Sequence, residues 1–298
     1  MTRYLYIISL CVAMVASFTI AQAQSTALTP AEGATHTYRW GDLVPGDNYE
    51  FYLTADASGS TVLDDSAVAE FDFVGSPTGN VGQDATVFLS INWNTGAAAN
   101  IYYLWFKVTS VQNGCSNRRY VRITPQSNSF DVLAENIPVD VTESCPNIAS
   151  SNGFNPVAGQ EDTGTTLLRF KVRRVNGTDN PLTAEVGDTY NWSFTASLTS
   201  VPDWANNLAI VSVEGSGNAI SFTDNGNGSY AVSNVAGSID EVIVTVKIDN
   251  LEGGSQVVSM LLNNMIEDTT NLNDSDSNND RVDHTIKVLP EIGTMNGV

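Results

Sequence analysis

The sequence predicts an all-β fold, with two tandem β-sandwich domains that follow an N-terminal signal peptide. Short runs in which apolar and polar residues alternate recur along the chain, and a period of two is typical of half-buried strands. Turn-forming residues separate these runs at the spacing that is typical of a sandwich. Beyond the signal peptide, no segment has the periodicity of a long amphipathic helix.

The N-terminal segment, residues 1–23, has the pattern of an export signal. Arg3 provides a positive charge, residues 5–20 are almost entirely apolar, and residues 21–23 read A-Q-A, which fits a cleavage site. The apolar run is shorter than the roughly 20 residues that span a bilayer, so we expect cleavage rather than a membrane anchor. Cys11 suggests lipidation as an alternative, but a small residue is missing before it. We expect no membrane span in the mature chain.

The first domain is expected at residues 24–146. Its strands are predicted at 35–40, 49–54, 86–93, 101–108 and 120–124, with a last edge strand inside 127–143. The pattern over 61–73 is ambiguous, although Phe71 and Phe73 share a face. The alternation is clearest in 86–93, where four apolar side chains share one face. Residues 101–124 form two strand-like runs joined by a turn that carries Asn113, Gly114 and Cys115, residue types that suit turns.

Two cysteines, Cys115 and Cys145, remain after cleavage. An even number in an exported chain favours a disulfide. Closing this loop would stabilise the fold by roughly 3–4 kcal/mol. A metal site built on the two thiols is the alternative, but no histidine lies near either cysteine in the sequence. We therefore expect a Cys115–Cys145 disulfide.

A linker is predicted at residues 147–166, where Pro, Ser, Asn and Gly accumulate. The second domain is expected at 167–290, followed by a tail at 291–298. Its strands are predicted around 168–173, 189–196, 208–213, 220–222, 230–232, 241–248, 257–262 and 284–289. The sequence D-N-G-N-G at 224–228 predicts a tight hairpin, because Asn and Gly tolerate positive φ.

Three cations share one face of the first strand of this second domain. Arg169, Lys171 and Arg173 alternate with apolar residues. We expect a solvated edge strand, on which positive charge discourages pairing with another edge. The alternative is a patch that docks an acidic neighbour.

The formal net charge of −20 comes from 33 acidic and 13 basic residues. Such a chain would repel phosphates, so nucleic-acid binding is not expected. The acidity favours solubility, and it supplies carboxylates that calcium could bind outside the cell.

Several windows resemble the immunoglobulin-like modules of secreted and cell-surface proteins of Bacteroidota-type bacteria. They are GATHTY at 33–38 with the aromatic run at 49–52, SINW at 90–93 with 108–115, and TDNGNGSY at 223–230. The resemblance implies two tandem immunoglobulin-like β-sandwich domains. It also implies export to the surface, often by the type IX route, and a role in adhesion, gliding or assembly.

Residues 263–283 are the best candidate for a metal site. The candidate calcium ligands are Asp274, Asp276, Asn278 and Asp280. Hard oxygen ligands at alternate positions suit calcium. The loop is not an EF-hand, because Asn279 and Thr285 stand where Gly and Glu are needed. The alternative is a solvated hairpin loop, which Asn, Asp and Ser also favour.

Tyr103 and Trp105 are the candidate ligand-binding residues, because they share the face opposite the predicted core and exposed rings can stack on sugars. The alternative is that a neighbouring segment covers this face.

Catalytic motifs are missing from the sequence. His36 and His284 lie in different predicted domains, and there is no nucleophile elbow, zinc-protease helix or phosphate-binding loop. We expect a non-catalytic exported protein without a cofactor, apart from the candidate calcium. It would act at the cell surface or outside the cell, with the periplasm as the alternative. Its expected role is structural or adhesive, through a protein partner or self-assembly, with a carbohydrate-binding module as the alternative.

Overall fold

The computed structural model describes residues 25–147, 153–155, 160–162, 164–176, 190–202, 208–250 and 255–288. The chain divides into two compact units, Met1–Ser127 (unit 1) and Asn128–Val298 (unit 2). The predicted signal peptide, the tail and half of the linker lie outside the described residues. No described helix is long and apolar enough to cross a membrane.

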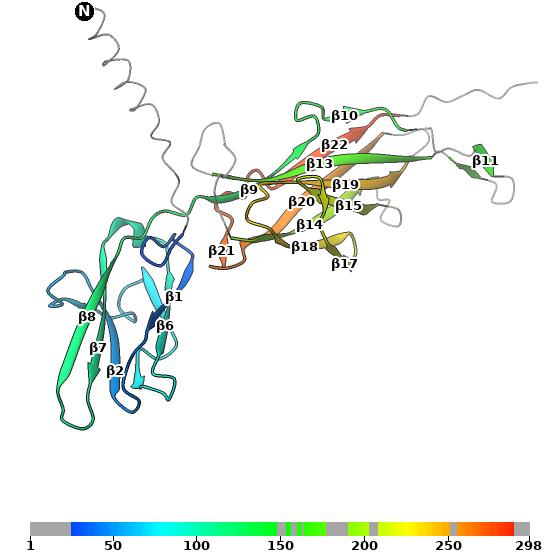
Figure 1. Cartoon of the computed structure of the whole chain (residues 1–298). Helices are drawn as coiled ribbons and strands as arrows, with labels where there is room; N and C mark the ends of the chain where they lie inside the picture. The colour runs from blue at the N-terminus through cyan, green and yellow to red at the C-terminus, as the bar shows by residue number, and fades with distance from the viewer. Residues whose placement is uncertain are drawn as a thin grey trace, which may run out of the picture. The chain divides into compact units, whose positions relative to one another are not determined.

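Unit 1 is a sandwich of two antiparallel sheets (Figure 1). The first sheet has the order β1 (Thr35–Trp40), β6 (Val87–Trp93) and β4 (Phe71–Val74). The second has the order β3 (Val62–Leu63), β2 (Asn48–Thr54), β7 (Tyr102–Thr109) and β8 (Ser116–Ile123), with β5 (Thr78–Asn80) beside β2. This is the B-E-D and C′-C-F-G strand order of an immunoglobulin domain. A 3-10 turn, Ala97–Ala99, precedes β7.

The core of unit 1 follows the alternation that the sequence predicts. Val87, Leu89, Ile91 and Trp93 on β6 all point inward and are buried. The indole Nε1 of Trp93 donates a hydrogen bond of 3.2 Å to the Tyr38 hydroxyl, so its polar atom is satisfied inside the core.

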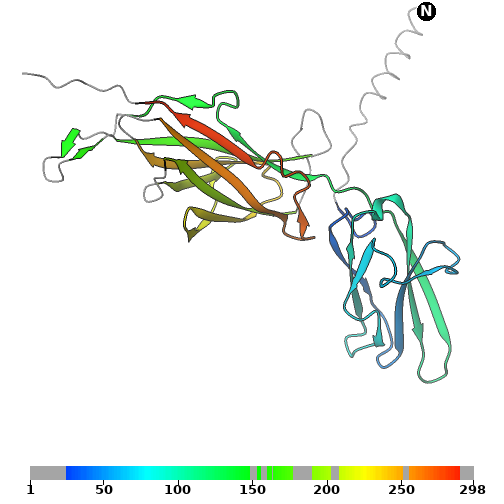
Figure 2. The ribbon, with the colours of Figure 1, turned by 180° about the vertical axis from the view of Figure 1, so that it is seen from behind.

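Unit 2 is a larger sandwich, with sheets of five and seven strands (Figure 2). The five-stranded sheet has the order β16 (Asn218–Ala219), β15 (Ala209–Gly215), β19 (Glu241–Asp249), β13 (Thr165–Asn176) and β9 (Phe130–Asn136). The seven-stranded sheet has the order β10 (Glu143–Ser144), β22 (Arg281–Ile286), β20 (Gln256–Glu267), β14 (Trp192–Val201), β18 (Ser229–Val235) and β17 (Phe222–Gly226), with β21 (Leu272–Asn273) beside β20. A separate hairpin joins β11 (Gly153–Asn155) and β12 (Gln160–Asp162).

An all-β fold is therefore confirmed for the described residues. The immunoglobulin strand order holds for unit 1, whereas unit 2 exceeds the seven to nine strands of that fold. The four alternate positions Val242, Val244, Val246 and Ile248 of β19 are fully buried, as the period of two predicts.

The segment that follows unit 1 belongs to unit 2. β9 pairs with β13 from Phe130↔Asn176 to Asn136↔Phe170, and β10 pairs in parallel with β22. The prediction that 127–143 supplies a last edge strand to the first domain is therefore wrong. The boundary between the units lies before residue 128, ahead of the predicted linker.

The β9–β10 segment also joins the two sheets of unit 2. The backbone N–H of Ala134 donates to the carbonyl of Asn279 at 3.1 Å, and the Asn136 amide donates to the carbonyl of Asp283 at 3.0 Å. Further along, Ser144 is the parallel partner of Ile286. Residues 143–144 therefore pair in parallel with 285–286, and single hydrogen bonds connect Ala134 and Asn136 to Asn279 and Asp283.

β13 is a central strand, because it lies between β19 and β9. The predicted solvated edge is a wrong assignment. Lys171 forms an ion pair of 3.3 Å with Glu241 on β19, and Arg173 forms one of 3.4 Å with Glu135 on β9. These cations are matched to acids on the two flanking strands.

The predicted hairpin is present as β17 and β18. Its turn contains Gly226, Asn227 and Gly228, which have φ values of 82°, 54° and 74°. Residue types that tolerate positive φ are required at all three positions.

Candidate functional site

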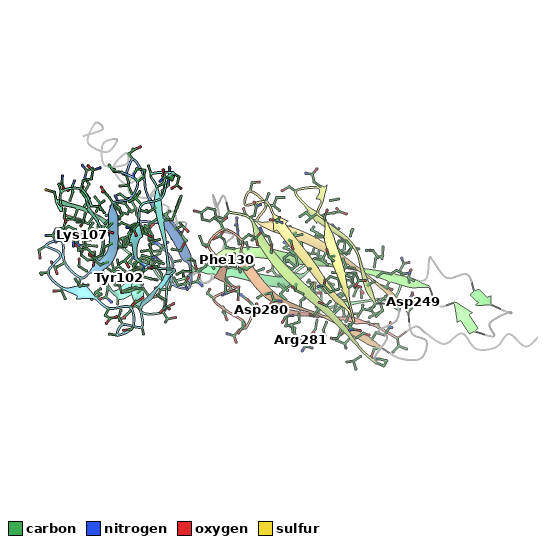
Figure 3. The ribbon with its side chains drawn as sticks, turned by 90° about the horizontal axis from the view of Figure 1, so that it is seen from below. Tyr102, Lys107, Phe130, Asp249, Asp280 and Arg281 are labelled. Atoms are coloured by element: carbon green, nitrogen blue, oxygen red, sulfur yellow. The ribbon has the colours of Figure 1, made fainter. Side chains whose placement is uncertain are left out.

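The acidic loop of unit 2 lies against the start of β9. The backbone N–H of Ser275 donates to the carbonyl of Phe130 at 2.9 Å, and the N–H of Asp274 donates to the carbonyl of Met265 at 3.2 Å. Phe130 and Asp280 lie at the same end of unit 2, away from Asp249 (Figure 3). Two segments that are far apart in the sequence therefore meet here.

Asp131, on β9, is a member of this cluster that the sequence analysis missed. Its side chain is fully buried, and the amide of Asn279 donates to both of its carboxylate oxygens at 3.2 and 2.9 Å. Asp274 accepts a hydrogen bond of 2.7 Å from the N–H of Val132. The contact with Val132 places Asp274 beside the strand position of Asp131, and Asp274 accepts a second hydrogen bond of 3.2 Å from the N–H of Asp276.

The predicted ligands differ in their surroundings. Asp274 is held by the N–H of Val132, Asp280 is buried, and Asp276 is half-buried and accepts a hydrogen bond of 3.0 Å from the N–H of Asn278. Asn278 is exposed, and it uses its amide to donate to Asp276 at 2.6 Å. The predicted role of Asn278 as a ligand is therefore not supported by its position, and the neighbouring Asn279 faces the cluster instead.

Two oxygen atoms in this cluster are buried and lack a hydrogen-bond partner, Oδ1 of Asp280 and Oδ1 of Asn279. Asp280 is only 7% exposed. A buried acceptor without a donor is costly, especially when it belongs to a carboxylate.

The acids of the cluster repel one another in a buried setting. Burial raises the pKa of Asp274 to about 8, and the charges of Asp131 and Asp280 add to the effect. Burial, with the charges of Asp131 and Asp276, raises the pKa of Asp280 to about 6. Burial also raises the pKa of Asp131. In the described part of the chain, no Lys, Arg or His forms an ion pair with these acids.

A metal site is not preassembled in this cluster. Across the described residues, no group of three or more His, Cys, Asp or Glu side chains is arranged so that it could hold a metal ion. The carboxylates are held instead by the hydrogen bonds given above.

The predicted sugar platform on unit 1 is covered. Trp105 is only 6% exposed, and its Nε1 donates to the Thr54 hydroxyl at 2.9 Å. The guanidinium of Arg118 lies 4.6 Å from the ring centroid, and Tyr52 stacks on the ring at 6.0 Å. Tyr103 is half-buried beside Tyr120. The expectation that Trp105 presents an open ring is wrong, because neighbouring side chains occupy its faces.

The predicted disulfide is absent, since Cys115 and Cys145 are both free and exposed. Cys115 lies in the turn between β7 and β8 of unit 1, whereas Cys145 follows β10 of unit 2. The prediction assumed that both cysteines belong to the first domain. This assumption is wrong, because Cys145 follows β10 and therefore belongs to unit 2.

Both histidines are buried on strands and hydrogen bonded. His36 on β1 contacts the hydroxyl of Ser25 at 2.8 Å. On β22, His284 contacts Asn136 at 3.0 Å through Nδ1 and Ser144 at 2.9 Å through Nε2. These contacts connect β22 to β9 and β10, which is a structural role.

β8 forms an exposed edge of unit 1. Along the described residues, its strand pairs with β7 only. Arg118, Arg119 and Arg122 are exposed on it, and Tyr120 is 44% exposed. Beside it lies a cavity of about 350 Å³ whose lining includes Trp40, Phe106 and Arg119. This edge combines unpaired backbone groups, positive charge and an aromatic side chain.

Comparisons with known proteins identify no family. No protein-family description and no curated protein matches the chain. Among solved structures, a chimeric titin Z1Z2 carrying a decorin peptide is 12% identical, with 91% of this chain and 94% of that chain covered and a TM-score of 0.34. A cohesin module from a family 33 glycoside hydrolase of Clostridium perfringens is 8% identical, with 54% and 96% covered and a TM-score of 0.30. Both scores are low, and no function is transferred from them.

Proposed function

We propose that this chain is a non-catalytic, exported structural or adhesion protein, which acts at the cell surface by binding an acidic protein partner along β8. The observation that carries the proposal is the open edge of β8 with its three arginines. An edge strand presents free N–H and C=O groups to which an extended segment can add.

The charge on β8 selects the kind of partner. Two β8 edges would repel each other, so the arginines discourage edge-to-edge pairing of identical strands. An acidic segment would be attracted instead, and the net charge of −20 makes other surfaces of a second copy suitable. A contact between two different surfaces of identical copies can continue into an open assembly.

Reversal of the charge on β8 tests this function. The triple variant Arg118→Glu, Arg119→Glu, Arg122→Glu should lose binding, and Arg169→Glu, on an exposed position of β13, is the matched control. Size-exclusion chromatography with light scattering should show wild-type assemblies that grow with concentration and dissolve with salt. The control should assemble like wild type.

If the partner is a different protein and not a second copy of this chain, crosslinking on cells is needed to find it. A photo-crosslinking residue at position 117 or 120 should give an adduct with an acidic protein, and the same residue at position 169 should give none. A protein that stays monomeric at all concentrations and forms no adduct from β8 contradicts the proposal. Proteolysis of intact cells tests export, since a surface protein is cleaved without lysis.

A further inference from the structure

We propose that unit 2 binds a calcium ion between β9 and the loop 274–280. The ligands are oxygen atoms of Asp131, Asp274, Asp276, Asn279 and Asp280. This inference concerns unit 2 and does not depend on the function proposed for β8.

The placement of the side chains is the first argument. The backbone N–H of Val132 on β9 donates to Asp274 at 2.7 Å, and the amide of Asn279 donates to both carboxylate oxygens of Asp131 at 3.2 and 2.9 Å. The loop and β9 therefore meet at the side chains of Asp131, Asp274 and Asn279, although Val132 and Asp274 are 142 residues apart in the sequence.

The unpartnered oxygens are the second, independent argument. Oδ1 of Asp280 and Oδ1 of Asn279 are buried, and neither accepts a hydrogen bond. Both side chains come from the same loop, and Asn279 already touches Asp131 through its amide. A cation between the loop and β9 would satisfy these oxygens.

The absence of a neutralising side chain is the third argument. Arg281, the cation nearest in sequence, is 2.9 Å from Asp283 and is paired with it. Among the described residues, the ion pairs leave Asp131, Asp274, Asp276 and Asp280 without a Lys or Arg partner. Buried acids in this state are normally paired or bound to a metal.

The donor set selects calcium. All the donors are carboxylate or amide oxygens, which are hard ligands, and no Cys or His is among them. Because the carboxylates must turn away from their present hydrogen bonds, the site needs an ion that accepts variable geometry. Calcium does so with six to eight oxygens, whereas magnesium demands a near-ideal octahedron.

Calcium binding to the full-length mature protein tests the proposal. Isothermal titration calorimetry with CaCl₂ should show binding, and MgCl₂ should bind more weakly. The melting temperature of unit 2 should rise by about 5–10 °C when calcium is about a hundredfold above its Kd. The variants Asp131→Asn and Asp280→Asn should abolish both signals, and Asp140→Asn, at an exposed position of unit 2, should keep them.

The order of the melting temperatures of wild type and Asp131→Asn, in EDTA and in calcium, shows whether Asp131 is a calcium ligand or only a structural residue. In EDTA, Asp131→Asn should melt at or above the wild-type temperature, because it removes repulsion between buried acids. In calcium, the wild type should melt higher. If Asp131→Asn does not fold, Asp276→Asn at the half-exposed edge of the cluster provides the same comparison by calorimetry. An unchanged wild-type melting temperature at millimolar calcium overturns the proposal, as does full binding by both Asp131→Asn and Asp280→Asn.

Discussion

Burial changes the ionisation of single polar side chains. His36 shows this in unit 1. It is 7% exposed, and its ring contacts Ser25, whose hydroxyl also accepts a hydrogen bond of 2.9 Å from the N–H of Ala31. Burial lowers the pKa of His36 from 6.5 to about 4. The imidazole is therefore neutral in the folded protein at neutral pH.

The first prediction concerns the pH dependence of unit 1. The folded pKa of His36 lies below the unfolded value, so the unfolded state binds more protons between pH 6.5 and pH 4. Its contribution to stability is full above about pH 6.5 and falls as the pH decreases toward 4, by at most about 3 kcal/mol. Urea unfolding followed by tryptophan fluorescence should show this loss for the wild type. The difference between wild type and His36→Gln should shrink over the same interval, and a constant difference contradicts the prediction.

The face of Trp105 shows what a sequence can and cannot reveal about one residue. The period of two correctly predicts that Trp105 lies opposite Leu104 and Phe106 along β7. The alternation within β7 does not reveal that Arg118 from β8 and Tyr52 from β2 contact the ring of Trp105. A residue that leaves the core on one face of a sheet can still be covered by side chains of neighbouring strands.

At the scale of the element, the alternation of residues identifies a strand but does not show which strands it pairs with. The strands β1, β2, β6 and β7 of unit 1 were predictable because each has alternating apolar and polar residues. The short strands β3, β4 and β5 and the first half of β8 lack a clear alternation and were not predicted as such. β9 was recognised as a strand and assigned to the wrong domain, since its partner is β13, beyond the predicted linker. Asp131 was missed as part of the acidic cluster for the same reason. Its nearness to Asp274 depends on a contact between residues 142 apart, Val132 and Asp274.

The second prediction uses the hairpin of β17 and β18. Gly226 and Gly228 both have positive φ, but only Gly228 lacks space, because an added Cβ would lie 2.8 Å from the carbonyl oxygen of Leu198. We expect Gly226→Ala to lower the free energy of unfolding by about 1 kcal/mol from backbone strain alone. Gly228→Ala should cost about 2–3 kcal/mol, because strain and overlap with the backbone add. Equilibrium denaturation compares the two, and equal costs would show that the contact with Leu198 yields easily.

At the scale of the whole molecule, the boundary before residue 128 has a practical consequence. Phe130, Val132 and Leu133 are buried in unit 2, and β9 covers one edge of β13. A fragment that starts at residue 147, as the predicted linker suggests, would expose this edge and lose those apolar contacts.

The third prediction is a comparison of two fragments of unit 2. The fragment 128–290 should fold, with a cooperative thermal transition by circular dichroism. The fragment 147–290 should aggregate or lack that transition, since it loses a strand from each sheet. A cooperative transition in the shorter fragment would mean that β9 and β10 are accessory to unit 2.

The parallel pairing of β10 with β22 would matter if unit 2 were pulled by its two ends. The two strands point in the same direction, and the N–H groups of Thr285 and Lys287 donate to the carbonyls of Thr142 and Ser144 at 2.8 and 2.9 Å. A pull that acts along the strands would load both hydrogen bonds together instead of opening them one after another.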